Sequence, residues 1–70
     1  MQQGDIVQII DETHPWVPAL LVVDEVKSWG VQAYVIVPQK NDGSEQCGQY
    51  FNRLTSDKIK KVGKVVIGIA

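Results

Sequence analysis

The sequence predicts an all-β domain, folded as a small, partly open barrel of five strands. Helix-period patterns are missing, and runs of β-branched residues bounded by Gly, Pro, Asn and Asp recur instead. The chain has 70 residues, 44% of them hydrophobic and 21% charged, which is typical of one folded domain over residues 1–70. Closing five short strands into a barrel would protect most of their edges.

Two strands and a long connection are predicted in the first half of the chain. DIVQII, at residues 5–10, places Val7 and Ile9 on one face of a first strand. ALLVVDEVK, at residues 19–27, predicts the second strand, and its first half is apolar on both faces. A half-buried strand needs only one apolar face, so we expect the second apolar face of this segment to be covered by other residues as well.

The next two strands follow from turn chemistry. Gly30 suits a tight turn, after which VQAYVIVP, at residues 31–38, returns as the third strand of a hairpin. A polar stretch at residues 39–46 contains an Asp-Gly turn signal and leads into CGQYFNRL, at residues 47–54, as the fourth strand. These segments are typical of an antiparallel meander.

A short turn and a last strand complete the prediction. TSDKI, at residues 55–59, predicts one 3-10 or helical turn, with Ile59 directed back toward the core. KVGKVVIGI, at residues 61–69, predicts the fifth strand. A barrel of this kind brings its first and last strands side by side.

The charges are unevenly distributed although the net charge is only -1 and the pI is near 5.6. Residues 1–25 carry five acids and no Lys or Arg, whereas residues 53–64 carry five bases and one acid. One interpretation is that the two ends are neighbours in space and form ordinary surface ion pairs. The alternative is a basic patch for phosphate or nucleic acid, formed by Arg53, Lys58, Lys60, Lys61 and Lys64.

The compartment is predicted from cysteine use and from the N-terminal sequence. A single cysteine, Cys47, excludes an internal disulfide framework and fits a reducing cytoplasm. No charged leader precedes Gly4, and no apolar run approaches the roughly 20 residues that cross a bilayer. We therefore expect a cytoplasmic protein with no membrane partner.

Short motifs over nearly the whole chain carry a family resemblance. They are Gly4-Asp5-Ile6-Val7, His14-Pro15-Trp16, Asp24-Glu25-Val26 with Trp29-Gly30, Tyr34-Val35-Ile36-Val37-Pro38, Arg53-Leu54, and Ile59 with Val62-Gly63-Lys64. With these motifs the chain resembles the SH3-like barrels, in particular small accessory proteins of bacteriophages and prophages. The resemblance implies an SH3-like barrel and, for a phage-encoded protein, the host cytoplasm; it implies no activity.

A weaker similarity is to the KOW-type modules of ribosomal and transcription factors, which also begin with a Gly-Asp-x-Val strand. Those modules reach RNA with a basic, glycine-rich first loop. The corresponding segment here, DETHPWVPAL at residues 11–20, is acidic and stiffened by prolines. RNA binding by that route is therefore not expected.

Catalysis is not expected from this sequence. His14 and Cys47 are the only side chains of their types, so no metal-ligand cluster is predicted. The acidic pairs Asp11-Glu12 and Asp24-Glu25 each consist of adjacent residues, whose side chains point to opposite sides of an extended chain. We predict no catalytic residue, no metal site and no cofactor.

Binding needs only a surface with aromatic anchors, and the chain has several. Trp16 is either a platform that forms one groove with Tyr34 and Tyr50 or a plug that closes the barrel mouth, and flanking prolines would stiffen either arrangement. Trp29 is either a binding residue or part of the hairpin packing. The candidate partner-binding residues are His14, Trp16, Trp29, Tyr34 and Tyr50.

Three functional hypotheses follow. The leading one is a non-catalytic interaction module, of the phage or prophage accessory type, that binds a host or phage protein through this aromatic face. The alternatives are a nucleic-acid-binding barrel that uses the basic cluster, and a nucleotide-binding sponge in which aromatic rings stack on a base.

Self-association as a homodimer is also predicted, because one small barrel cannot readily hide all of the apolar residues. The segments ALLVV, at residues 19–23, and VVIGIA, at residues 65–70, contain no charge. The alternative is that the C-terminal segment folds over the open end of its own barrel. The candidate self-association residues are Leu21, Val23, Val65, Ile67 and Ile69.

Overall fold

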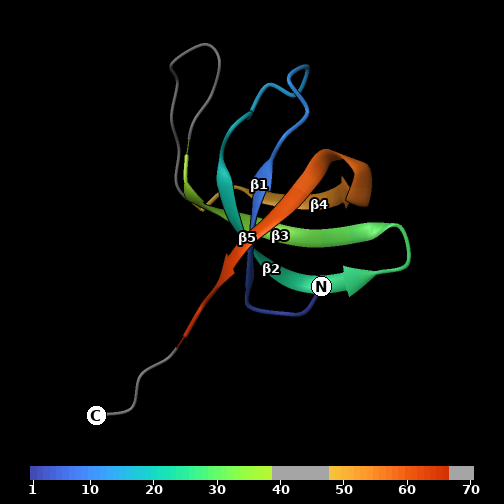
Figure 1. Cartoon of the computed structure of the whole chain (residues 1–70), viewed down its shortest axis with the longest axis vertical. Helices are drawn as coiled ribbons and strands as arrows, with labels where there is room; N and C mark the ends of the chain where they lie inside the picture. The colour runs from blue at the N-terminus through green and yellow to red at the C-terminus, as the bar shows by residue number, and fades with distance from the viewer. Residues whose placement is uncertain (39–47, 67–70) are drawn as a thin grey trace.

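Five antiparallel strands form one sheet in the order β4-β3-β2-β1-β5 (Figure 1), in a computed structural model that describes residues 1–38 and 48–66. The prediction of an all-β fold with a single 3-10 turn before the last strand is confirmed. The elements are β1 (Asp5–Ile9), β2 (Leu20–Lys27), β3 (Gly30–Val37), β4 (Tyr50–Thr55), the 3-10 turn η1 (Ser56–Lys58) and β5 (Ile59–Lys64).

The first and last strands lie side by side, as predicted. β1 pairs with β5 in antiparallel register, from Ile9 opposite Ile59 to Asp5 opposite Lys64, with an irregularity between Ile6 and Val7. β4 and β5 are the two ends of the strand order, so the barrel stays open between them. The connection between β1 and β2, residues 10–19, is named the first loop below.

Alternation along the strands builds the core. On β3, Val31, Ala33 and Val35 are buried at 2% exposure or less, whereas Tyr34 between them is exposed. Because successive strand residues point to opposite faces, this pattern defines an inner and an outer face of the sheet. The core cluster comprises Val7, Ile9, Trp16, Ala19, Leu21, Val23, Val31, Ala33, Val35, Leu54 and Ile59.

The last strand begins earlier and ends earlier than the predicted residues 61–69. Ile59 already belongs to β5 and is buried, which confirms that this side chain turns back toward the core. After Lys64 the chain leaves the ladder, and the Val65 N–H donates to the Gly4 carbonyl oxygen at 2.7 Å. Residues 67–69 of the predicted strand lie outside the described residues.

The fourth strand also begins later than predicted, at Tyr50 rather than residue 47. Cys47, at the predicted strand start, and the Asp42-Gly43 turn signal both lie outside the described residues. Within residues 1–38 and 48–66, the structure contains no helix with the length and apolar character needed to cross a bilayer.

Candidate functional site

Two exposed tyrosines stand directly opposite each other on the outer face of the sheet. Tyr34 on β3 is the register partner of Tyr50 on β4, and the two residues are 40% and 38% exposed. Directly opposed residues of an antiparallel pair share one face and lie close enough to interact. The two predicted binding tyrosines are therefore brought together.

A carboxylate on β2, two strands away from β4, accepts a hydrogen bond from one of these tyrosines. The Tyr50 hydroxyl donates to Asp24 Oδ2 on β2 at 2.9 Å and lies 3.5 Å from Gln32 Oε1. Burial and the hydrogen bond to Asp24 raise the pKa of Tyr50 above its ordinary value of 10.0. The surface formed by Asp24, Gln32, Tyr34 and Tyr50 is named the tyrosine face.

The predicted groove of Trp16, Tyr34 and Tyr50 is wrong, because Trp16 lies on the other side of the sheet. Its side chain is only 8% exposed and belongs to the core cluster. A small barrel has few large residues with which to fill its interior, and the indole is the largest available. The plug interpretation of Trp16 is confirmed, and the platform interpretation is not.

Phe51 is the aromatic residue that sequence reasoning missed. Its ring meets Trp16 edge to face with centroids 5.5 Å apart, and it meets His14 in the same way at 5.7 Å. The alternation along β4 contains the signal, since Phe51 follows Tyr50 and must point to the opposite face. His14, Trp16 and Phe51 form what is named the inner aromatic cluster, so His14 does not lie on the tyrosine face.

Trp29 pairs with a residue from the predicted basic cluster. The Arg53 guanidinium carbon lies 4.5 Å from the centroid of the Trp29 ring, which is a cation–π arrangement. Trp29 is half-buried at the β2–β3 turn, and its carbonyl oxygen accepts the Ser56 N–H at 3.2 Å. The two contacts join the hairpin to β4 through Arg53 and to η1 through Ser56, as the hairpin-packing interpretation expected.

Two of the five predicted phosphate-binding bases are paired with acids from the beginning of the chain. Lys58 lies 2.8 Å from Asp11, and Lys61 lies 3.3 Å from Asp5. The ends of opposite charge are therefore neighbours, as the first interpretation of the charge distribution predicted. The Gln2 N–H and Lys61 lower the pKa of the Asp5 carboxyl, while burial acts in the other direction.

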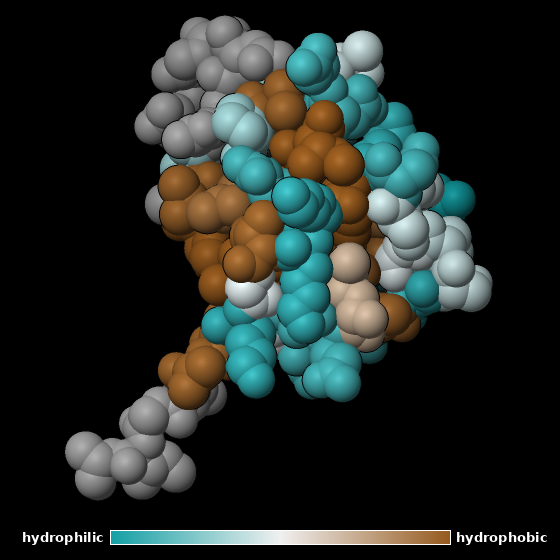
Figure 2. Space-filling model, viewed as in Figure 1, coloured by the Kyte–Doolittle hydropathy of each residue, from teal (hydrophilic) through white to brown (hydrophobic). Residues whose placement is uncertain are grey.

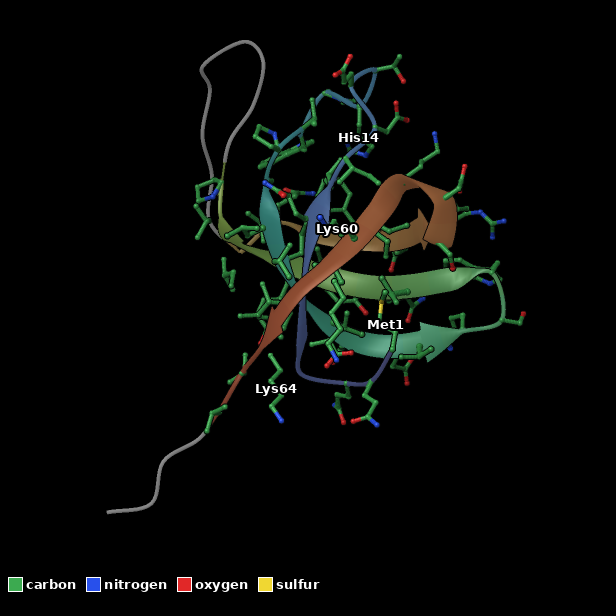
Figure 3. All side chains as sticks on the ribbon, viewed as in Figure 1. Met1, His14, Lys60 and Lys64 are labelled. Carbon is green, nitrogen blue, oxygen red and sulfur yellow. The ribbon has the colours of Figure 1, made fainter. Side chains whose placement is uncertain are left out.

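Lys60 and Lys64 remain exposed on β5 and form no ion pair within the part of the chain that is described. Figure 3 shows both along this strand, with Lys60 between His14 and Lys64 in this view. In Figure 2, hydrophilic residues run down the middle of the face that β5 crosses, and hydrophobic residues gather beside them. Of the five predicted phosphate-binding bases, Lys60 and Lys64 thus lie on one edge strand of the sheet.

The predicted self-association strip is wrong in its β2 part. Leu21 and Val23 are 0% and 1% exposed and point into the barrel, so neither is available to a second copy. The opposite face of β2 is also covered: Val22 is 6% exposed between its register partners Ile6 and Tyr34. Val65 is 47% exposed, and the remaining two predicted residues, Ile67 and Ile69, lie outside the described residues.

The candidate site is therefore an open surface, since no pocket is found in the described residues. No group of three or more His, Cys, Asp or Glu side chains in residues 1–38 and 48–66 is placed to hold a metal ion. The sequence matches no protein-family model, and comparisons with curated proteins and with solved structures found no match.

Proposed function

We propose that the chain is a non-catalytic interaction module that binds a protein partner through the tyrosine face. The observation that carries this proposal is the opposed pair of Tyr34 and Tyr50, both well exposed on the outer side of the sheet. Tyrosine offers a large, rigid and amphipathic contact area at a low cost in side-chain entropy. Such residues are enriched among those that dominate binding energy at protein interfaces.

The charge next to the tyrosines defines the chemistry of the partner. Asp24 is held at the edge of the face by the Tyr50 hydroxyl, and Glu25 follows it along β2. A docking segment that suits this surface places an apolar side chain on the rings and a Lys, Arg or amide N–H near Asp24. The rings supply most of the affinity, and the carboxylate supplies orientation.

The ion pairs of β5 and η1 make a nucleic-acid partner the weaker candidate. Lys58 and Lys61 are already paired with Asp11 and Asp5, so a phosphate backbone would have to compete with these carboxylates. The Arg53 guanidinium is engaged by the Trp29 ring. A nucleotide is also the weaker candidate, because the exposed tyrosines lie next to the carboxylate of Asp24. This negative charge would repel the phosphate of a nucleotide whose base stacks on the rings.

The test is a selection of peptides from a random library on the wild-type chain, followed by mapping of the bound peptide by NMR chemical shifts. Tyr34→Ser and Tyr50→Ser are expected to weaken binding about tenfold or more, the usual loss at an interface hot spot. Val62→Ser is the matched control, because Val62 is 48% exposed on the other edge strand. Peptides that bind both tyrosine variants as tightly as the wild type would refute the proposal.

A further inference from the structure

The first loop contains a hydrogen bond from a backbone N–H to a histidine ring, and this bond depends on the protonation state of the ring. The Trp16 N–H donates to His14 Nδ1 at 3.0 Å. Only a ring nitrogen without a proton can accept, so this bond requires neutral His14 with its proton on Nε2. A proton on Nδ1 would instead bring two N–H donors face to face at the same distance.

The residue that receives this bond holds the loop against the barrel. The Trp16 side chain is buried in the core with its ring against Phe51, and its carbonyl oxygen accepts the Ala19 N–H at 2.7 Å. The Val17 N–H donates to the His14 carbonyl oxygen at 3.2 Å. His14 therefore contacts the loop through its backbone and its ring at the point where the tryptophan enters the core.

The surroundings of His14 favour the neutral ring. It is half-buried and packs edge to face on Phe51 of β4. Burial lowers the pKa of His14 below 6.5, and two charged groups act on it in opposite directions: Asp11 raises the pKa and Lys58 of η1 lowers it. Because Asp11 and Lys58 are paired with each other at 2.8 Å, their effects largely offset one another.

We propose that His14 is a pH-operated latch on the first loop. The neutral ring holds Trp16 in the closed barrel mouth, and protonation of Nδ1 releases the loop and increases the accessibility of Trp16. This device goes beyond the proposed function, because it acts on the inner aromatic cluster and does not depend on what the tyrosine face binds.

The direction of the effect follows from linkage. The closed loop lowers the pKa of His14, so a proton binds the open loop more tightly and shifts the population toward it. The open fraction is unaffected above the ordinary histidine pKa of 6.5, rises as the pH falls below that value, and levels off below the pKa of the closed form. Each unit of difference between the two pKa values changes the ratio of open to closed loops about tenfold.

The experiment measures quenching of Trp16 fluorescence by acrylamide between about pH 8 and about pH 5, the range in which histidine titrates. The full chain carries Trp29→Phe, so that Trp16 is the only tryptophan left. Quenching is expected to increase as the pH falls, with a midpoint below 6.5. Circular dichroism at each pH checks that the sheet is still folded.

The matched control is His14→Asn, whose side-chain oxygen accepts the Trp16 N–H and does not titrate in this range. Its quenching is expected to stay low and independent of pH. The latch would be overturned if quenching in the chain that retains His14 did not change with pH. It would also be overturned if quenching rose equally at low pH in the His14→Asn variant. If Trp29→Phe fails to fold, the chain with both tryptophans is labelled with fluorotryptophan, and 19F NMR resolves Trp16 from Trp29. The pH dependence of the Trp16 signal, with His14 and with His14→Asn, is then interpreted in the same way.

Discussion

Lys58 Nζ lies 2.8 Å from Asp11 Oδ2, and this ion pair joins η1 to the first loop across 47 residues of sequence. The other oxygen of Asp11 accepts the Thr13 N–H at 2.9 Å and the Thr13 hydroxyl at 2.6 Å. One carboxylate therefore fixes the start of the loop that inserts Trp16 into the core. The opposite charges at the two ends of the chain have a structural role here.

Asp11→Asn is expected to lower the thermal midpoint at neutral pH, because the variant loses the charge that Lys58 faces. The hydrogen bond from Lys58 is the largest cause that lowers the pKa of Asp11, followed by those from Thr13. A carboxyl whose pKa is lowered on folding stabilises the fold above its unfolded pKa, near 3.8, and loses this contribution as the pH falls below it. Thermal melts from neutral pH into acid check this.

The difference between Asp11→Asn and the wild type is therefore expected to shrink progressively in acid. Glu12→Gln is the control, because Glu12 is exposed and directly follows Asp11 in the chain. A midpoint difference that stays constant from neutral pH down to strong acid would contradict the stabilising role of the Asp11 charge, because protonation of the carboxyl removes that charge.

Trp16→Ala is expected to destabilise the fold by about 3–5 kcal/mol, as large-to-small substitutions of core aromatics do. The change removes the ring that packs on Phe51 and leaves a void in a small core. Urea unfolding followed by circular dichroism measures the cost. Trp29→Ala is the comparison, since Trp29 is only half-buried at a turn and should cost less. Equal losses for the two variants would contradict the assignment of Trp16 as the barrel plug.

The strands could be predicted from the sequence because their alternation is local. Val31, Ala33 and Val35 point inward and Tyr34 outward, as the pattern of β3 requires. The ends of strands were less predictable, because tertiary pairing sets them: Ile59 joins β5 through its pairing with Ile9. Residues more than forty positions apart in sequence decide such a boundary.

The aromatic residues of the site could be chosen from the sequence, but their grouping could not. A loop residue has no strand alternation to show which face of the sheet its side chain enters. The sequence therefore does not show that Trp16 packs on the inner side, away from Tyr34. The uncharged first half of β2 predicts an apolar face that is exposed in a single copy, and this prediction is also wrong. Its outer residue Val22 is covered between Ile6 and Tyr34 within the same sheet, so no second copy is needed to bury it.

Gly30→Ala is expected to destabilise the fold by about 1–3 kcal/mol or more, the usual range for overpacking. A Cβ at this position would collide with the Leu54 carbonyl oxygen and approach Thr55 Cα to 2.8 Å. Backbone atoms in a paired strand have little freedom to move aside, so the β3–β4 ladder must shift. Chemical unfolding of the variant tests this, and Gly63→Ala is the control because its nearest neighbour, Ile6 Cδ1, is 3.9 Å away. Equal stability of the two variants would refute the close approach at Gly30.

Thr55→Val is expected to stabilise the fold by about 1 kcal/mol, because it removes a buried polar atom that has no hydrogen-bond partner within the described residues. Thr55 ends β4 directly before η1, and its side chain makes no capping hydrogen bond to that turn. Valine keeps the branched shape that packs in a strand and replaces the hydroxyl with a methyl group. Thr55→Ser is the matched control, since it keeps the hydroxyl, loses the methyl group and should be destabilising. Urea unfolding of the three chains measures both differences, and a Thr55→Val chain less stable than the wild type would mean that the hydroxyl is hydrogen-bonded in solution.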